Sequence, residues 1–304
     1  MSNVQLWIVG SIGIDDIETS AEKRKDVLGG SVTYACAAAS FFTRVGAVGV
    51  VGNDFPAPFL ARYRRFGIDL AGLQTRAGAT FRWSGVYEAD MINRRTLDTK
   101  LGVFADFSPE LPDSFREAPF VLLGNIGPAL QLHVLDQVRG RPFVVVDTMD
   151  LWIRIARPAL EQVIRRANLL TVNDAEARLL TGRHNLLECA RAILEMGPQY
   201  VVIKKGEHGA MLCSAQGLAL IPAFPVENVV DPTGAGDCFA GGFMGFLART
   251  RASRIDEALL RRALLHGSVV ASFGVEAFST ERLERLQAAE IEARVEALKA
   301  MCAV

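Results

Sequence analysis

The chain has 304 residues, of which 33 are basic and 34 acidic, and its net charge is −1. A near-neutral chain without a basic stripe is a poor partner for nucleic acid or an anionic membrane, so neither is expected. Half of the residues are hydrophobic, which is enough to bury the core of one large domain. The five cysteines are scattered and include no C-x-x-C pair. This pattern argues against a disulfide framework or a zinc site and predicts a cytoplasmic protein.

Short apolar runs alternate with helical stretches along the chain. Strands are predicted at 6–10, 48–52, 120–125, 143–147, 169–173 and 200–205. Each run is rich in β-branched residues and ends in a polar residue or glycine, as expected for parallel strands that are buried on both faces. We therefore predict an α/β fold in which helices flank both faces of a mostly parallel sheet. Ligands of such sheets bind beyond the carboxyl ends of the strands.

Two segments differ from these runs because polar and apolar residues alternate in them. They lie at about 11–20 and 78–105, and alternation is typical of strands with one face in water. We predict that they form a small β-sheet lid across the carboxyl edge of the main sheet, although ordinary surface hairpins are the alternative. The whole chain, 1–304, is predicted to be a single domain, and its segment 281–300 has the spacing of an amphipathic surface helix.

The stretch "DPTGAGDCFAGGF", residues 231–243, places glycines and an aspartate at a predicted strand-to-helix turn. It contains neither a Walker loop nor a dinucleotide G-x-G-x-x-G fingerprint. The N–H groups of Gly234, Ala235 and Gly236 would point freely from a helix N-terminus, which favours an anion. Asp237 follows on the first turn, where a helix cap is one interpretation. A carboxylate beside an anion site suits phosphoryl transfer better, because it can accept the proton of an attacking hydroxyl.

Four motifs together resemble the ribokinase-like carbohydrate kinases, also called the PfkB family. The stretch 231–243 resembles the C-terminal signature of that family. The segment 27–55, with the paired Gly29 and Gly30, resembles its N-terminal signature. Between them, "NDAE" (173–176) is similar to the N-x-x-E motif and "KKGEHGA" (204–210) to a nucleotide-side turn. The motifs occur in the order of the family and cover almost the whole chain.

The resemblance implies an ATP-dependent kinase in which Asp237 is the general base and Gly234, Ala235 and Gly236 form the anion hole. It implies that Asn173 and Glu176 organise Mg²⁺, largely through water, although a helix capping box is the alternative. Further residues are implied to lie on the nucleotide side: Lys204, Gly206, Gly209 and His266. A surface lysine and a packed histidine are the alternatives for two of them.

The resemblance also implies an acceptor side formed by Asp15, Gly29, Gly30 and Asn125. Asp15 is preferred to its neighbour Asp16, because alternation along the segment puts it opposite Ile12 and Ile14. In some relatives the positions of Asp231 and Thr233 hold a monovalent cation such as K⁺. The exposed lid of this family often pairs with its twin, which predicts a homodimer.

The sequence departs from ribokinase-type members of the family near the expected acceptor. It has Gly13 where they have asparagine and Ser31 where they have lysine, so two groups that bind a free pentose are missing. Tyr34, Met149 and Trp152 suggest a more aromatic pocket. The prediction is a kinase for a primary hydroxyl of a sugar or sugar-like acceptor, with a nucleoside as the alternative. A catalytically inactive ligand-binding relative is a second alternative, and a nucleotide-binding oxidoreductase is disfavoured by the failed fingerprint.

Overall fold

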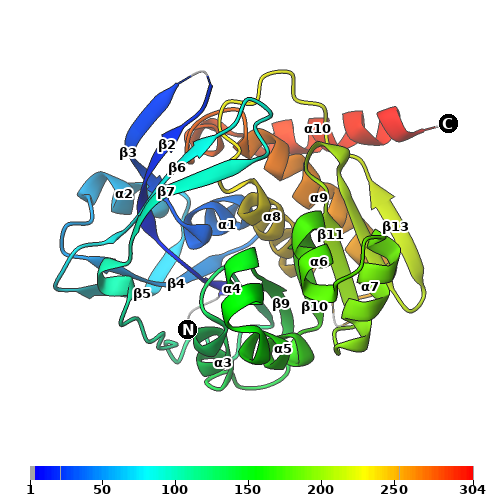
Figure 1. The fold of residues 1–304 in the computed structure, drawn as a ribbon, viewed down its shortest axis with the longest axis horizontal. Coiled ribbons are helices and arrows are strands. Elements are labelled where there is room, and N and C mark those ends of the chain that lie inside the picture. Colours follow the sequence, from blue (N-terminus) through cyan, green and yellow to red (C-terminus); the bar gives the residue numbers. More distant parts are fainter. Residues whose placement is uncertain (1–3, 21, 253, 304) are drawn as a thin grey trace.

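The computed structural model describes residues 4–20, 22–252 and 254–303, and within them the strands form two sheets (Figure 1). The large sheet has the order β13-β12-β11-β10-β9-β8-β1-β4-β5. Its strands are β1 (Leu6–Val9), β4 (Val45–Gly52), β5 (Asp69–Arg76), β8 (Phe120–Leu123), β9 (Phe143–Asp147), β10 (Leu169–Asn173), β11 (Tyr200–Lys204), β12 (Ala210–Ser214) and β13 (Gly217–Ile221). The second sheet has the order β3-β2-β6-β7, with β2 (Gly13–Glu18), β3 (Lys23–Gly29), β6 (Phe81–Tyr87) and β7 (Arg94–Lys100).

The helices lie between and around these strands. The α-helices are α1 (Ser31–Ser40), α2 (Ala57–Arg65), α3 (Pro128–Leu135), α4 (Asp150–Ile155), α5 (Arg157–Arg166), α6 (Asp174–Thr181), α7 (Leu186–Glu195), α8 (Ala235–Thr250), α9 (Glu257–Gly274) and α10 (Ala288–Cys302). The described residues also form short 3₁₀ helices, namely η1 (Gly102–Phe104), η2 (Gly206–His208) and η3 (Leu283–Arg285). Among the described residues, no helix is both long and apolar enough to cross a bilayer.

The large sheet is parallel from β11 to β5, and β12 and β13 join it antiparallel at one edge. The predicted α/β class is therefore confirmed, and each of the six predicted strands is present. The strands are short because each crosses the interior once, and nearly every residue of β1, β4 and β8 is buried. The parallel arrangement brings the carboxyl ends of these strands to one edge of the sheet.

Helices cover both faces of the large sheet, as predicted. On one face, α1, α2, α8 and α9 bury apolar side chains against the strands. On the other face, α3, α4, α5, α6 and α7 form a second core. Helix α8 is close to α1 because its glycines leave no side chain between them: a Cβ at Gly241 would lie 2.1 Å from the carbonyl oxygen of Ala35. The glycines inside the stretch 231–243 thus serve packing as well as the turn.

The small sheet corresponds to the predicted lid, with one addition. Strand β3 lies outside the predicted segments 11–20 and 78–105 and pairs with β2, while β2 pairs in parallel with β6. The charged sequence "KRKDVLG" of β3 gave no strand signal. The lid contacts the loop before α8, where the Thr233 hydroxyl donates to the Tyr87 hydroxyl at 3.2 Å. The predicted C-terminal helix is present as α10, preceded by η3.

Candidate active site

Three neighbouring strands end together beneath the start of α8. Strand register pairs Thr171 with Asp147 and Asn173 with Lys204. Because the strands are parallel, their terminal polar residues meet at one edge, beyond the apolar core. The sequence predicted this edge as the functional one, and it carries a carboxylate from β9, an amide from β10 and an ammonium group from β11.

The start of α8 has the geometry of an anion site. Gly234 is the N-cap, with a φ of 75° in the left-handed region that favours glycine. A Cβ there would lie 2.3 Å from the ring of Tyr34, so no side chain fits. In the part of the chain that the structure describes, the N–H groups of Gly234, Gly236 and Asp237 donate to no protein atom. The partly positive hydrogens of these three N–H groups are therefore available to an anion.

The predicted anion hole needs one adjustment. The N–H group of Ala235 donates to the carbonyl oxygen of Pro232 at 3.2 Å, which closes the turn before the helix. This amide is therefore the least available of the predicted set 234–236. The free N–H group of Asp237 lies one residue further along the same turn. The sequence showed where the helix begins but not which amide the turn itself would use.

Asp237 lies on the first turn of α8 and is half-buried. Burial, together with the negative charge of Asp147, raises the pKa of Asp237 to about 7, while Lys204 and Arg94 act in the opposite direction. A carboxylate with a near-neutral pKa can accept a proton at physiological pH and is basic enough to hold it. The side chain accepts no hydrogen bond from the N–H groups of its own helix, among the bonds of the described residues. It is therefore not acting as the cap of α8.

Lys204 lies at the floor of this site and is not a surface lysine. Its ammonium nitrogen is 3.0 Å from Oδ1 of Asp147, and its side chain is 17% exposed. A Cβ at Gly236 would lie 3.2 Å from the same nitrogen. Burial alone would lower the pKa of Lys204, but attraction to Asp147 and Glu176 outweighs it, so the pKa is raised. The positive charge of Lys204 therefore lies against the turn at the start of α8, whose free N–H groups are available to an anion.

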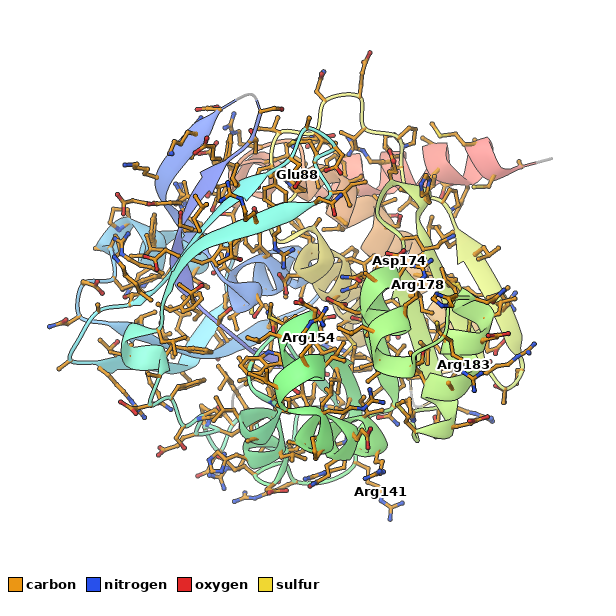
Figure 2. All side chains as sticks on the ribbon, viewed as in Figure 1. Glu88, Arg141, Arg154, Asp174, Arg178 and Arg183 are labelled. Carbon is orange, nitrogen blue, oxygen red and sulfur yellow. The ribbon has the colours of Figure 1, made fainter. Side chains whose placement is uncertain are left out.

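Asn173 and Glu176 form a capping box at the start of α6. Oδ1 of Asn173 accepts the N–H of Glu176 at 2.8 Å, and Oε2 of Glu176 accepts the N–H of Asn173 at 2.7 Å. Burial raises the pKa of Glu176 to about 7, partly offset by Lys204. Figure 2 labels Asp174 and Arg178 on the same helix, where they form an ion pair with partly exposed side chains. The capping box, which was the alternative interpretation of these two residues, is therefore present. It fixes the carboxylate of Glu176 at the edge of the sheet.

The carboxylates of this edge are suited to a divalent cation that keeps most of its water. Among the described residues, no three His, Cys, Asp or Glu side chains are arranged to hold a metal directly. Mg²⁺ usually takes only one or two carboxylates and is otherwise held by water and phosphate oxygens. Oε1 of Glu176 is not used by the capping box, and burial raises the pKa values of both Glu176 and Asp237. A bound divalent cation would favour the charged form of these carboxylates. The residues present therefore fit Mg²⁺.

The structure brings together Asp15, Gly29 and Gly30, which were predicted to bind the acceptor. A Cβ at Gly29 would lie 1.9 Å from Oδ2 of Asp15, so the carboxylate touches the backbone of the glycine pair. Gly30 is the N-cap of α1. Burial, reinforced by the charge of Asp231, raises the pKa of Asp15 to about 8. Its neighbour Asp16 accepts the N–H of Asp26 and faces the β3 side, which agrees with the preference for Asp15.

Asp231 and Thr233 organise the loop before α8. Oδ1 of Asp231 accepts the N–H of Thr233 at 2.9 Å, and Oδ2 accepts the N–H of Ser279 at 3.4 Å. Burial raises the pKa of Asp231, although these hydrogen bonds oppose the shift. Gly206 and Gly209 flank η2 in the turn between β11 and β12. The turn follows Lys204 directly on the chain, and its place on the nucleotide side stays a prediction.

Two predicted binding residues have other contacts. The ring of His266 stacks on Phe246 with centroids 3.9 Å apart and bonds to the carbonyl oxygen of Arg262. This places it in the packing between α8 and α9, as the alternative of a packed histidine has it, and its role beside the adenine stays a prediction. Asn125 accepts the indole N–H of Trp152 at 2.8 Å, and its amide nitrogen is 3.1 Å from the sulfur of Met149. Its side chain holds Trp152 in place at the acceptor edge.

Other residues of the site were only weakly indicated by the sequence. Asp147 ended a predicted strand, but its partner Lys204 lies 57 residues away on the chain. Tyr34 reaches the site because it is on the first turns of α1, against Gly234. Arg94 of the lid lowers the pKa values of both Asp237 and Glu176, which places its charge near them. Only the arrangement of the parallel strands and the lid brings these residues together.

The chain is similar to known proteins over most of its length. The cytidine kinase of Thermococcus kodakarensis is 29% identical over 256 residues, which cover 82% of this chain and 90% of that protein. A nucleoside kinase from Methanocaldococcus jannaschii has a TM-score of 0.77 at 18% identity and covers 98% of this chain and 100% of its own. An Escherichia coli protein named after ribokinase, in complex with ATP and Mg²⁺, has a TM-score of 0.79 at 18% identity, with coverage of 97% and 99%.

These likenesses extend over almost the whole chain, and the two solved structures share its fold. A family model described as "pfkB family carbohydrate kinase" matches residues 9–284. That match includes both predicted signatures, the N-x-x-E motif and the turn after Lys204. The chain belongs to the pfkB family of carbohydrate kinases.

Proposed function

We propose that the protein transfers the terminal phosphoryl group of ATP to the primary hydroxyl of a nucleoside. One observation carries the proposal: Asp237 lies beside free N–H groups at the start of α8, with the Lys204 ammonium group against Gly236. This combination supplies a base and a positive environment within one turn of the chain. During transfer, negative charge develops on the phosphoryl group at this place. Fixed dipoles stabilise that charge without having to reorganise.

The proposed transfer uses these groups in one step. Asp237 accepts the proton of the primary hydroxyl, and the oxygen attacks the terminal phosphorus in line with the bond to ADP. That bond breaks as the new one forms, and ADP leaves with the bonding electrons. The N–H groups of Gly234 and Gly236, together with Lys204, hold the equatorial phosphoryl oxygens. The lid excludes water, which would otherwise compete as the acceptor.

Mg²⁺ fits the carboxylate edge and, when bound, would neutralise charge on the nucleotide phosphates. Glu176 would hold it, largely through water, with Asn173 keeping the carboxylate in place. On the nucleotide side, Gly206 and Gly209 would allow the backbone of the η2 turn to approach ATP. The related E. coli protein binds ATP and Mg²⁺, which supports both assignments. K⁺ at Asp231 and Thr233 stays a prediction.

The nucleoside is preferred to a free sugar for two reasons. The cytidine kinase relative is similar over 82% of this chain, and a half-buried Trp152 is fixed by Asn125 at the acceptor edge. An aromatic ring held in this way offers a face on which a nucleobase can stack. A free pentose has no such surface. A free sugar such as ribose stays the second candidate, because the E. coli protein is named after ribokinase.

An acceptor panel tests the proposal. ADP release is measured with MgATP and, in separate reactions, cytidine, inosine, adenosine, ribose and deoxyribose. The expected result is turnover with at least one nucleoside, and mass spectrometry with periodate-sensitive analysis should identify a 5′-monophosphate. Turnover with ribose alone would favour the second candidate. Acceptor binding without any turnover would instead indicate a catalytically inactive relative.

Two further assignments remain predictions. Pairing of the lid with that of a second copy is supported by β7, whose residues are exposed along its whole length, including Leu97. The cytoplasmic location rests on the cysteine pattern, and the five cysteines are free in the structure. Size-exclusion chromatography with light scattering measures the oligomeric state directly. A monomer at all concentrations would contradict pairing through the lid.

A further inference from the structure

Gln131 is a buried residue of α3 that bonds to the ends of β8 and β9. It is 1% exposed. The nitrogen of its side-chain amide donates to the carbonyl oxygen of Gly124 at 2.9 Å and to that of Asp147 at 3.1 Å. A side-chain amide has two N–H groups, so both bonds can exist at the same time. One side chain therefore joins the ends of two strands.

The two carbonyl groups are at the point where the pairing of β8 with β9 stops. The last paired residues are Leu123 and Val146, and Gly124 and Asp147 follow them directly on the chain. Beyond the last pair, parallel strands can spread apart, because no further ladder of backbone hydrogen bonds joins them. The amide of Gln131 takes the place of the next rung and holds the two strand ends at a fixed spacing.

The two strand ends lead to different parts of the candidate active site. Asn125 is the residue after β8 and its first bonded carbonyl, and it holds the indole of Trp152 at the acceptor edge. Asp147 ends β9 and holds the ammonium group of Lys204 beside the anion site. In the proposed function, the acceptor lies at the first of these places and the phosphoryl group at the second. The spacing of the strand ends therefore contributes to the distance between the two substrates.

Stability alone does not account for a glutamine at this position. Among the described residues, Oε1 of Gln131 is buried and accepts no hydrogen bond, and an unpaired buried acceptor costs folding free energy. An apolar side chain of similar length would avoid that cost, but it would remove the donor that joins Gly124 to Asp147. What the amide provides is therefore the connection made by its two N–H groups.

We propose that Gln131 is a positioning residue for phosphoryl transfer, because it sets the spacing between the indole of Trp152 and the ammonium group of Lys204. This inference rests on the proposed function for the reaction itself. Each of the two places keeps its own contacts when the amide is absent, so each substrate still binds. The attacking oxygen and the phosphorus atom then lose their alignment, and a displacement of about 1 Å can lower the rate about 10²-fold.

Gln131→Met keeps the length of the side chain and removes both N–H donors. We expect kcat for the best acceptor to fall about 10-fold to 100-fold. The dissociation constants for MgATP and for the acceptor, each measured by calorimetry, should change little. Weaker binding of the acceptor with an unchanged kcat would show a damaged pocket instead of lost alignment and would overturn the inference. An unchanged kcat together with unchanged binding would overturn it as well.

Gln131→Glu is a smaller change and serves if the methionine variant does not fold. A carboxyl group that is buried without a charged partner stays neutral. It then keeps one of the two donors and can bond to only one strand end. Its kcat should also fall, although less than in Gln131→Met, and each substrate should still bind. The kcat of the wild type in this variant would show that the two bonds are not needed together, which contradicts the proposal.

Gln137 provides a matched control. It is half-buried, and its amide nitrogen also donates to two carbonyl oxygens, those of Pro109 at 2.8 Å and His133 at 3.3 Å. Its Oε1 accepts the N–H of Leu111, and none of these three partners belongs to the candidate site. Gln137→Met should therefore lower the melting temperature and leave kcat unchanged. Equal losses of kcat in the two methionine variants would indicate a general loss of stability and would contradict a positioning role.

Hydrogen exchange tests the connection between the strands without turnover. Backbone N–H groups at the ends of β8 and β9 should exchange faster in Gln131→Met than in the wild type, whereas Gln137→Met should leave them unchanged. Unchanged exchange in Gln131→Met would overturn the inference while wild-type turnover remains. Failure of the proposed function is a different result, because the wild type would then transfer no phosphate to any acceptor of the panel. The positioning role would fall with it, whatever the exchange rates.

Discussion

The ammonium group of Lys204 is 3.0 Å from Oδ1 of Asp147, and the same oxygen accepts the hydroxyl of Thr171 at 2.6 Å. The pair therefore fixes a positive charge against Gly236, beside a helix N-terminus that is itself positive. Without a ligand, the positive charge of Lys204 lies beside the positive N-terminus of α8, and the negative charge of the buried Asp147 offsets both. With a phosphate group bound, both features become attractive. We interpret the pair as a preformed charge for the anion site.

Replacing the lysine should affect both rate and pH dependence. Lys204→Met is expected to lower kcat about 10²- to 10³-fold, as loss of a preorganised charge does. It also removes the positive charge that lowers the pKa of Asp237. The acid limb of the pH profile of kcat/KM for the acceptor should therefore move to higher pH. If the acid limb of the pH profile stays in place, Lys204 does not influence the pKa of Asp237.

The same variant should be less stable. It leaves the buried Asp147 carboxylate without its partner, and breaking a buried pair in this way typically costs about 3–5 kcal/mol. Circular dichroism at the assay temperature should therefore confirm that the variant is folded before its kinetics are compared. A stability equal to that of the wild type would mean that water already screens the pair.

Asp147→Asn should shift the acid limb in the opposite direction. The charge of Asp147 raises the pKa of Asp237, so its removal should let the base ionise at lower pH. The control is Asp174→Asn (labelled in Figure 2), which makes the same chemical change at a partly exposed carboxylate that is paired with Arg178. It should leave the limb in place. A shift in the same direction for Lys204→Met and Asp147→Asn would contradict the electrostatic explanation.

The strands around the site were predictable because their burial left a simple pattern. Strands β9 and β10 match the predicted segments 143–147 and 169–173, since continuous apolar runs end there in a polar residue. Strand β5 was missed because it is at the edge of the sheet and mixes polar and apolar residues. Antiparallel β12 and β13 were missed because the chain returns after only a short turn.

The site was predictable only where its residues are close together on the chain. Asp237 and its glycines share one turn, so their spacing carries the chemistry. The pair formed by Asp147 and Lys204 depends on strand register, and the contact of Tyr34 with Gly234 depends on how α1 lies against α8. For the histidine in α9, motif order could not reveal that its ring stacks on Phe246, and a role beside the adenine stays a prediction.

Gly234 should tolerate no side chain. In Gly234→Ala the new Cβ would lie 2.3 Å from the Tyr34 ring, at a φ of 75°. We expect kcat/KM to fall by about 10² or more, because the anion-binding amide must move. Gly182→Ala is the control: its φ is 69°, but nothing lies within 4 Å. That variant should lose about 1 kcal/mol of stability and keep normal kinetics. Equal kinetic losses in the two variants would point to backbone strain alone.

Asp237→Asn should separate proton transfer from binding. The amide has the shape of the carboxylate but cannot accept the proton, so kcat should fall about 10²- to 10⁴-fold. The dissociation constant for MgATP should change little, because the N–H groups at the start of α8 are unaltered. Single-turnover measurements and nucleotide titrations check the two halves of this expectation. Activity near that of the wild type would exclude Asp237 as the base.

Stability of the ligand-free protein should fall as the pH rises. Burial raises the pKa of Asp237 to about 7 and that of Asp15 to about 8, whereas an aspartate in the unfolded chain has a pKa of about 3.9. Between about pH 4 and pH 8 the unfolded chain therefore releases these protons first, and each rise in pH favours unfolding. The contribution of these two carboxyl groups to stability is complete below about pH 4. It is lost as the pH rises past their pKa values in the folded protein.

Asp15→Asn tests the origin of this pH dependence. The amide cannot ionise, so the decrease in melting temperature between pH 5 and pH 8 should become smaller, and at pH 8 the variant should be at least as stable as the wild type. Acceptor binding should weaken at the same time, because the amide has one acceptor oxygen where the carboxylate has two and cannot become negatively charged. An unchanged slope would show that Asp15 is already ionised in the folded protein. In that case a cation or water at the lid junction, instead of a proton, would balance its charge.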